Sequence, residues 1–134
     1  MGTRSTTKIY RIWKDEKGKE HKELYLALYK QYDGDTGSWG KHLKEFINKG
    51  VWVNGLNETK GSNQFNGIGD FALLLVKEFK DGSGGLYATS SKDKQQYNYV
   101  ITYISDEYKS YEAVLRIECE EDKSFNQEIK FTVK

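Results

Sequence analysis

Side chains able to bind a polar ligand are concentrated in the first half of the chain. An arginine can hold a carboxylate or phosphate through two hydrogen bonds, and an aromatic ring can stack on a planar base. Glycines at the start of a helix leave backbone N–H groups open to an anion. The candidate ligand-binding residues are Arg4, Ser5, Gln31, Tyr32, Asp33, Gly34, Trp39, Asn66, Gly67 and Gly69. Together they suit a ligand with an aromatic base and anionic groups.

The predicted strands bring these residues to one place. Residues 6–13 and 23–29 are rich in β-branched, aromatic and other apolar side chains, and a polar turn at 14–20 separates them. If the two segments form an antiparallel hairpin, Arg4 lies at the same open end as residues 31–33, and the loops before both predicted helices reach that end too. The alternative is that Arg4 pairs with the aspartate of that segment only to hold the N-terminus in place.

Catalytic signatures are missing from the sequence. His21 and His42 do not have the spacing of a metal-binding motif, and the sequence predicts no metal site and no cofactor. The string at 37–40 is one residue short of a serine nucleophile elbow. We therefore predict a protein that is not an enzyme. In an enzyme, Asp33 and His42 would be the candidates for a general base.

Two further features are best explained by a protein core. Cys119 lies in an alternating strand beside Glu118 and Glu120, whose charges should raise the pKa of its thiol. Three tyrosines at 97, 99 and 103 share one face of a predicted strand. Acidic residues outnumber basic ones around them, which favours a core or a protein-binding surface over a platform for nucleic-acid bases.

Hydrophobic periodicity predicts an α+β fold in a single domain over residues 1–134. Leu43, Phe46 and Ile47 indicate a short helix that ends at Gly50, and residues 67–80 form a longer one. The remaining strands are predicted at 86–88, 97–104, 113–119 and 129–133, and loops at 33–40 and 54–66. The expected arrangement is an antiparallel sheet with two helices on one face, in the order β-β-α-α-β-β-β-β. Because 23–29 is nearly all apolar, we expect it to be buried on both faces.

Charge and hydropathy exclude several classes of partner. The 134 residues include 21 Lys and Arg against 20 Asp and Glu, so there is no strong field to attract nucleic acid or an anionic membrane. Residues 1–67 hold 12 basic and 8 acidic residues (+4), whereas 68–134 hold 9 and 12 (−3). There is no apolar run of about 18 residues for a membrane span and no signal-peptide core. We expect a soluble, cytoplasmic protein.

Three motifs resemble a family of short phage and prophage proteins. These are Gly2-Thr3-Arg4-Ser5, then Tyr29-x-Gln31-Tyr32-Asp33-Gly34 with Gly37 and Gly40 in step, and Asn66-Gly67-Ile68-Gly69. The resemblance covers roughly residues 2–87, and it implies a viral or mobile-element origin, with the bacterial host's cytoplasm as the location. Its motifs fall on the candidate ligand-binding residues.

The leading hypothesis is a phage-type accessory protein that antagonises bacterial antiviral defence by sequestering a nucleotide-like signalling molecule. Arg4 would hold the anionic part and Tyr32 or Trp39 the base. One alternative is an anti-CRISPR-like inhibitor that binds a host defence protein through the acidic second half, and another is a small nucleotide-processing enzyme. Open sheet edges would also allow a homo-oligomer.

Overall fold

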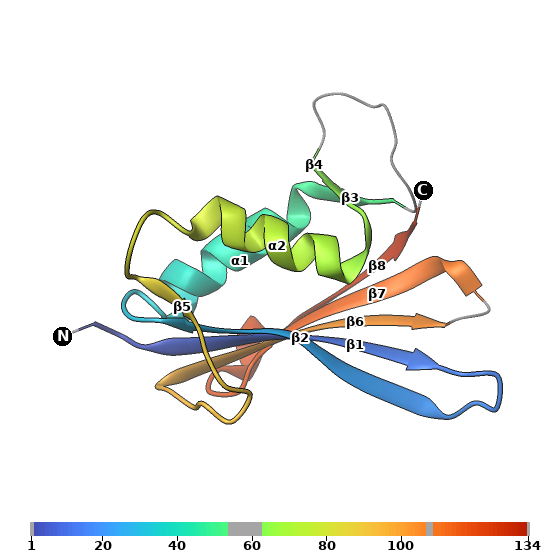
Figure 1. Ribbon diagram of the computed structural model, residues 1–134, viewed down its shortest axis with the longest axis horizontal. Coiled ribbons are helices and arrows are strands. Elements are labelled where there is room, and N and C mark those ends of the chain that lie inside the picture. The colour runs from blue at the N-terminus through green and yellow to red at the C-terminus, as the bar shows by residue number, and fades with distance from the viewer. Residues whose placement is uncertain (1, 54–62, 107–108, 134) are drawn as a thin grey trace.

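The computed structural model describes residues 2–53, 63–106 and 109–133. In this part of the chain, two α-helices cover one face of a six-stranded sheet, as Figure 1 shows, and this confirms the predicted α+β fold. The elements, in chain order, are β1 (Ser5–Lys14), β2 (Glu20–Lys30), the π-helical turn η1 (Thr36–Gly40), α1 (Lys41–Asn48), β3 (Gly50–Trp52), β4 (Asn63–Phe65), α2 (Gly67–Phe79), β5 (Leu86–Ala88), β6 (Tyr97–Asp106), β7 (Lys109–Cys119), the 3₁₀ turn η2 (Lys123–Phe125) and β8 (Gln127–Thr132).

The strands of the main sheet follow the order β5-β2-β1-β6-β7-β8. Neighbours run antiparallel, as predicted, except that β1 and β6 are parallel, with Ser5 opposite Tyr97. Period-2 alternation indicates which side chains share a face, but it does not identify the neighbouring strand. The long connection between β1 and β6 contains both helices, and a parallel pair requires a long crossover of this kind.

The core lies between the sheet and the helices. Ile9, Ile101 and Leu115 come from three adjacent strands and are almost completely buried. Leu43 of α1 and Leu75 of α2 close over them, as the predicted helical periodicity requires. Burying one such side chain stabilises the fold by about 1.5–3 kcal/mol. Tyr99 and Cys119 belong to the same buried cluster, so assigning them to the core was correct.

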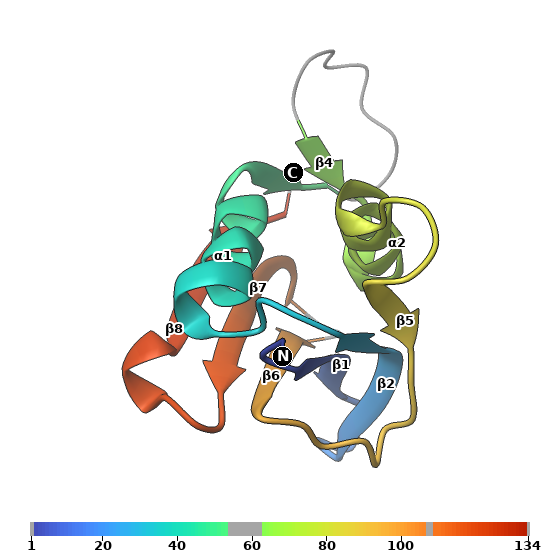
Figure 2. The ribbon, with the colours of Figure 1, turned by 90° about the vertical axis from the view of Figure 1, so that its left-hand side faces the viewer.

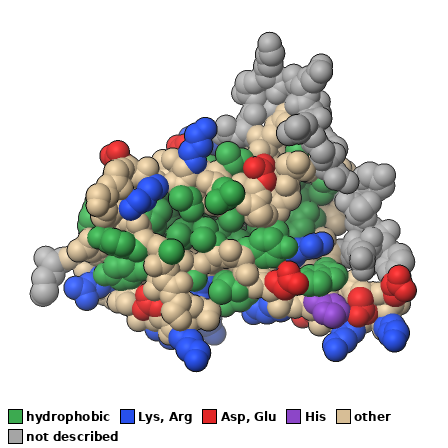
Figure 3. Space-filling view, viewed as in Figure 1, with side chains coloured by type: hydrophobic (Ala, Val, Ile, Leu, Met, Phe, Trp, Pro, Cys, Tyr) green, Lys and Arg blue, Asp and Glu red, His purple; other side chains and the backbone are tan. Residues whose placement is uncertain are grey.

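The first half of β2 differs from the prediction of burial on both faces. Leu24 and Tyr25 are 40% and 39% exposed. The register against β1 shifts next to Tyr25, and β5 pairs only with Leu28–Lys30. Within the described part of the chain, the earlier residues of β2 therefore have β1 as their single strand neighbour. Figure 3 shows hydrophobic side chains gathered on this face of the molecule, where α2 lies over β2. Leu73, in α2, is also exposed.

Two segments predicted as loops contain regular structure. Residues 36–40 form the π-helical turn, because the backbone N–H of Gly40 bonds to the Asp35 carbonyl at 3.2 Å. Residues 63–65 form β4, which pairs in parallel with β3, while 54–62 lie outside the described residues. Three residues are too few to show a periodic pattern.

No helix in the described part of the chain is long and apolar enough to cross a membrane.

Candidate functional site

The structure brings most of the predicted ligand-binding residues together. We call Arg4, Ser5, Gln31, Tyr32, Asp33, Gly34 and Trp39 the N-terminal cluster. The backbone N–H of Gly34 bonds to the Thr3 carbonyl at 2.9 Å, so the segment after β2 lies against the start of β1, as the hairpin predicts. The phenol of Tyr99 donates to the Gly34 carbonyl at 2.7 Å. Burial raises the pKa of this phenol, which keeps it protonated as the donor.

The N-terminal cluster is packed shut where the two segments meet. A Cβ added to Gly34 would lie 2.6 Å from the Ser5 Cβ, and one added to Gly2 would lie 2.6 Å from the Tyr32 Cβ. Both glycines therefore allow a close approach that other residues would prevent. Ser5 is completely buried, and its hydroxyl has no hydrogen-bond partner in the described structure.

Trp39 is part of the core and is not available to stack on a ligand. It is 1% exposed, and its indole Nε1–H donates to the Thr7 hydroxyl at 2.8 Å. Its ring meets Phe79 edge-on, with centroids 4.9 Å apart. An aromatic residue within a glycine-rich segment looks exposed in the sequence, but the π-helical turn directs this one into the core.

The exposed residues of the N-terminal cluster lie on an open surface. Tyr32 is 49% exposed, and the Lys30 ammonium lies 4.9 Å from its ring centroid. Burial lowers the pKa of Lys30, and the charge of Asp33 partly opposes that shift. Arg4 is exposed and makes no ion pair within the described residues. The N-terminus is held instead by backbone hydrogen bonds, including Tyr97 N–H to the Arg4 carbonyl at 3.1 Å.

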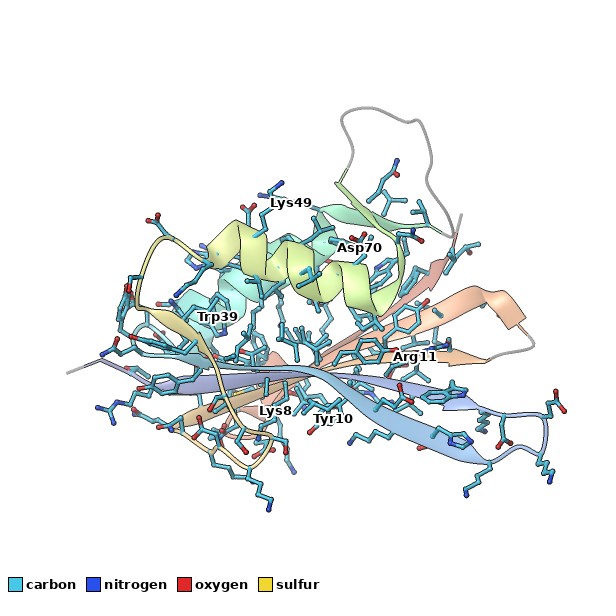
Figure 4. All side chains as sticks on the ribbon, viewed as in Figure 1. Lys8, Tyr10, Arg11, Trp39, Lys49 and Asp70 are labelled. Carbon is cyan, nitrogen blue, oxygen red and sulfur yellow. The ribbon has the colours of Figure 1, made fainter. Side chains whose placement is uncertain are left out.

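The residues at the start of α2 lie away from the N-terminal cluster, which corrects their grouping with it. Figure 4 places Asp70, in the first turn of α2, and Trp39 at opposite ends of the helical layer. The backbone N–H of Asn66 donates to the Asp70 carboxylate at 2.8 Å. The start of α2 is therefore already paired with an anion from its own chain. Gly67 has φ +82°, and Gly69 lies beside the Tyr25 ring. These two glycines serve the turn and the packing of α2.

A groove between α1 and α2 offers a better site. Its volume is about 630 Å³, within the range of small-molecule pockets. Its apolar lining includes Phe46 from α1, Phe65 from β4, and Leu74 and Phe79 from α2. The ring centroids of Phe46 and Phe65 are 5.3 Å apart, and those of Phe46 and Phe79 are 5.8 Å apart. We call this the helix groove, and its lining contains none of the predicted ligand-binding residues, although it includes His42, a candidate general base.

Polar groups from both helices complete the helix groove. His42 and Glu45 line it from α1, and Lys49 lines it from the residue after α1. Lys77 and Glu78 line it from α2, and Gln64 from β4. The His42 ring lies over Phe79, with centroids 6.3 Å apart. Lys49 points away from the sheet in Figure 4. His42, Glu45 and Lys49 are separated by three and then four residues, and this spacing places side chains on one face of a helix. The sequence therefore contained a signal for this polar face. Periodicity assigned the phenylalanines to the core, because it cannot show a gap between two helices.

The described residues do not assemble a catalytic centre from the candidate bases. His42 lines the helix groove, whereas Asp33 belongs to the N-terminal cluster. No three His, Cys, Asp or Glu side chains within 2–53, 63–106 and 109–133 could hold a metal ion. The pKa of the Cys119 thiol is raised, as predicted, but burial is the main cause, and the nearby acids that raise it are Glu121 and Asp122.

Three acidic residues near the end of β7 form contacts within the chain. Glu121 accepts hydrogen bonds from the backbone and side-chain nitrogens of Asn98, at 2.6 and 3.0 Å. Glu118 lies 3.9 Å from the Arg116 guanidinium, and Glu120 lies 3.4 Å from the Lys94 ammonium. These contacts reduce the charge that the acids could present to a protein partner.

Comparisons of the chain with known protein families, with curated proteins and with solved structures find no match.

Proposed function

We propose that this chain is a non-enzymatic protein that binds and sequesters a nucleotide-like small molecule in the helix groove. The observation that carries the proposal is an aromatic floor of the partly exposed Phe46 and Phe79 beneath a polar rim. A base stacked on aromatic side chains gains about 1–3 kcal/mol. Lysines on the rim can hold an anionic group, and the carboxylates can accept hydrogen bonds from an exocyclic amine or a ribose hydroxyl.

The charge of the rim restricts the class of ligand. Lys49 and Lys77 are balanced by Glu45 and Glu78, and all four line the helix groove. A triphosphate would meet two carboxylates with too few cations to neutralise it. The groove therefore favours a ligand with one or two negative charges, such as a monophosphate or a cyclic nucleotide.

The biological setting follows from the resemblance to short phage and prophage proteins. A small protein of that kind, when it sequesters a nucleotide-like signal in the bacterial cytoplasm, acts as an antagonist of antiviral defence. This role requires tight binding and no turnover.

A panel of mono-, di- and cyclic nucleotides and ADP-ribose derivatives tests the proposal through the melting temperature. A ligand at about 100 times its Kd stabilises the protein by about 2.7 kcal/mol, which shifts the melting temperature by several degrees. The ligand should be recovered intact after heating, as judged by mass spectrometry. A panel without any shift contradicts the proposal, and a converted ligand indicates an enzyme.

Variants locate the site. Lys49→Ala and Lys77→Ala, made as separate variants, should each weaken binding of the ligand identified by the panel roughly tenfold or more, because each lysine contributes a charged hydrogen bond. Lys17→Ala, in the turn between β1 and β2, removes the same charge far from the groove and should leave affinity unchanged. Arg4→Ala separates the two candidate sites, because it should abolish binding only if the ligand lies at the N-terminal cluster.

A further inference from the structure

The outer edge of β8 is an open sheet edge, and its protection against pairing is limited to the charges of Glu128 and Lys130. β8 is the last strand of the main sheet, and Figure 2 shows it outside α1, with no described element beyond it. Its register against β7 contains no bulge, and residues 127–132 contain no proline. The opposite edge is better protected, because β5 covers part of β2 and the rest carries the irregularity at Tyr25. Unprotected edges are templates for pairing with another strand.

The hydrogen bonds of β7 determine which groups of β8 point outward. The N–H of Glu120 bonds to Asn98 on the β6 side, and the N–H of Cys119 bonds to Asn126 on the β8 side. Backbone groups alternate along a strand, so Leu115, which is opposite Ile129, also points toward β8. The N–H and C=O groups of Ile129 therefore point inward, toward β7. Those of Glu128, Lys130 and Thr132 point outward and have no strand partner among residues 2–53, 63–106 and 109–133.

The outward groups are complementary to a second copy of themselves. In an antiparallel pair related by a twofold axis through Ile129, Glu128 lies opposite Lys130 of the second copy, and the reverse also holds. Each Glu128–Lys130 pair is of the hydrogen-bonded type. The Glu128 and Lys130 side chains lie on the face of the sheet away from the helices. An axis through Glu128 or Lys130 would place like charges opposite each other, which destabilises a cross-strand pair.

The same register also buries apolar side chains. Ile129 and Phe131 lie on the helix-facing side of β8 and are only partly buried. With the axis at Ile129, the two isoleucines meet across the junction as a non-hydrogen-bonded pair, the closer of the two antiparallel pair types. Backbone hydrogen bonds, charge complementarity and apolar contact therefore favour the same register.

We propose that two copies of this chain associate by antiparallel pairing of their β8 strands about Ile129, which joins the two sheets into one. The charge pattern of β8 sets the register. The helix grooves remain open, because their lining residues come from α1, β4 and α2. Ligand binding and association are therefore independent properties.

Sedimentation of the full chain over a concentration series tests the proposal. The natural sequence should form a dimer. Lys130→Glu replaces two attractive contacts with two repulsive ones, and it should raise the dimer Kd roughly tenfold. Glu128→Lys makes the same exchange and also removes the ion pair, at 3.6 Å, that Glu128 forms with Arg116 within the chain, so it should weaken the dimer at least as much. The double exchange Glu128→Lys/Lys130→Glu restores the complementarity between the two copies, and it should lower the Kd below that of either single variant.

The control applies the same charge change to the other edge. Glu20→Lys, in β2, should leave the dimer unchanged. A chain that remains monomeric at about 100 μM, a dimer weakened by Glu20→Lys, or a double exchange that fails to restore association would each overturn the proposal.

A covalent measurement checks the register. In Ile129→Cys, the two thiols face each other across a pair whose Cα atoms are about 4.5 Å apart, so mild oxidation should give a disulfide-linked dimer. Thr132→Cys places the thiols too far apart and should give no linked dimer. The natural Cys119 is buried and does not interfere. A linked dimer in Thr132→Cys but not in Ile129→Cys would exclude this register.

Discussion

The N-terminal cluster and the helix groove are built from similar side chains, yet one is closed and the other is open. Both combine aromatic rings with cations and carboxylates. In the N-terminal cluster, Gly2 and Gly34 let two backbone segments touch, and Trp39 is buried with its N–H bonded. In the helix groove, the rings of Phe46 and Phe79 pack edge-on with centroids 5.8 Å apart and remain partly exposed.

The difference shows that composition does not decide which cluster can bind. Glycine allows backbone to close on backbone, and this removes the space that a ligand would need. Two helices that cross a sheet side by side leave a gap wherever their facing side chains do not interdigitate. The following predictions test how far the N-terminal cluster and its neighbours serve the stability of the fold.

Trp39→Ala should have the largest effect. A buried tryptophan replaced by alanine typically costs about 3–5 kcal/mol, and here the Thr7 hydroxyl also loses its donor. Urea unfolding measures the loss. If Trp39 were instead an exposed stacking platform, the free energy of unfolding would remain nearly unchanged.

Gly34→Ala should destabilise the fold by about 1–3 kcal/mol, because the new Cβ would lie 2.6 Å from the Ser5 Cβ and 2.9 Å from the Thr3 carbonyl. Gly37→Ala is the matched control, since its Cβ would meet nothing closer than 3.4 Å. Thermal unfolding of the two variants compares them. Equal stabilities would mean that the N-terminal cluster is looser than the contact distances indicate.

Lys30→Met should change the alkaline limb of the stability curve. Burial lowers the pKa of Lys30 below 10.5, so the folded protein disfavours the charged form. As pH rises through the lowered pKa toward 10.5, the native chain releases this proton before the unfolded chain does, and stability rises. The variant lacks that rise. Urea midpoints measured across this pH range for both proteins check the difference, and parallel curves would contradict it.

Arg4→Ala should have the smallest effect on stability, within about 0.5 kcal/mol, because the side chain is exposed and makes no ion pair within the described residues. Thermal unfolding measures this directly. A large loss would restore the hypothesis that Arg4 holds the N-terminus in place.

Local pattern predicted most of the elements of this fold. Alternation located β7 and β8, and helical spacing located α2, because each of these segments buries one face. The parallel β1–β6 pair and the short β4 could not be found in this way, since neither the partner of a strand nor a three-residue strand has a periodic signal.

The candidate site was harder to predict than the fold. The hairpin argument correctly brought Arg4 close to Gly34, but it could not show that the junction is packed shut. It also placed Gly67 and Gly69 at the wrong end of the helical layer. The helix groove depends on the distance between two helices, and no single segment of sequence contains that information.

The parallel pairing of β1 with β6 has a consequence for how the chain reaches this fold. β1 is a central strand, but its second neighbour begins at Tyr97, more than ninety residues after Ser5. On a ribosome that adds about 5–20 residues per second, the β1–β2 hairpin therefore emerges seconds before its second neighbour. Contacts this distant in sequence also slow refolding. The nascent chain consequently exposes one unpaired edge of a central strand. Chaperone dependence, and circular permutants that place β6 directly before β1 in the sequence, would show how this delay affects folding in the cell.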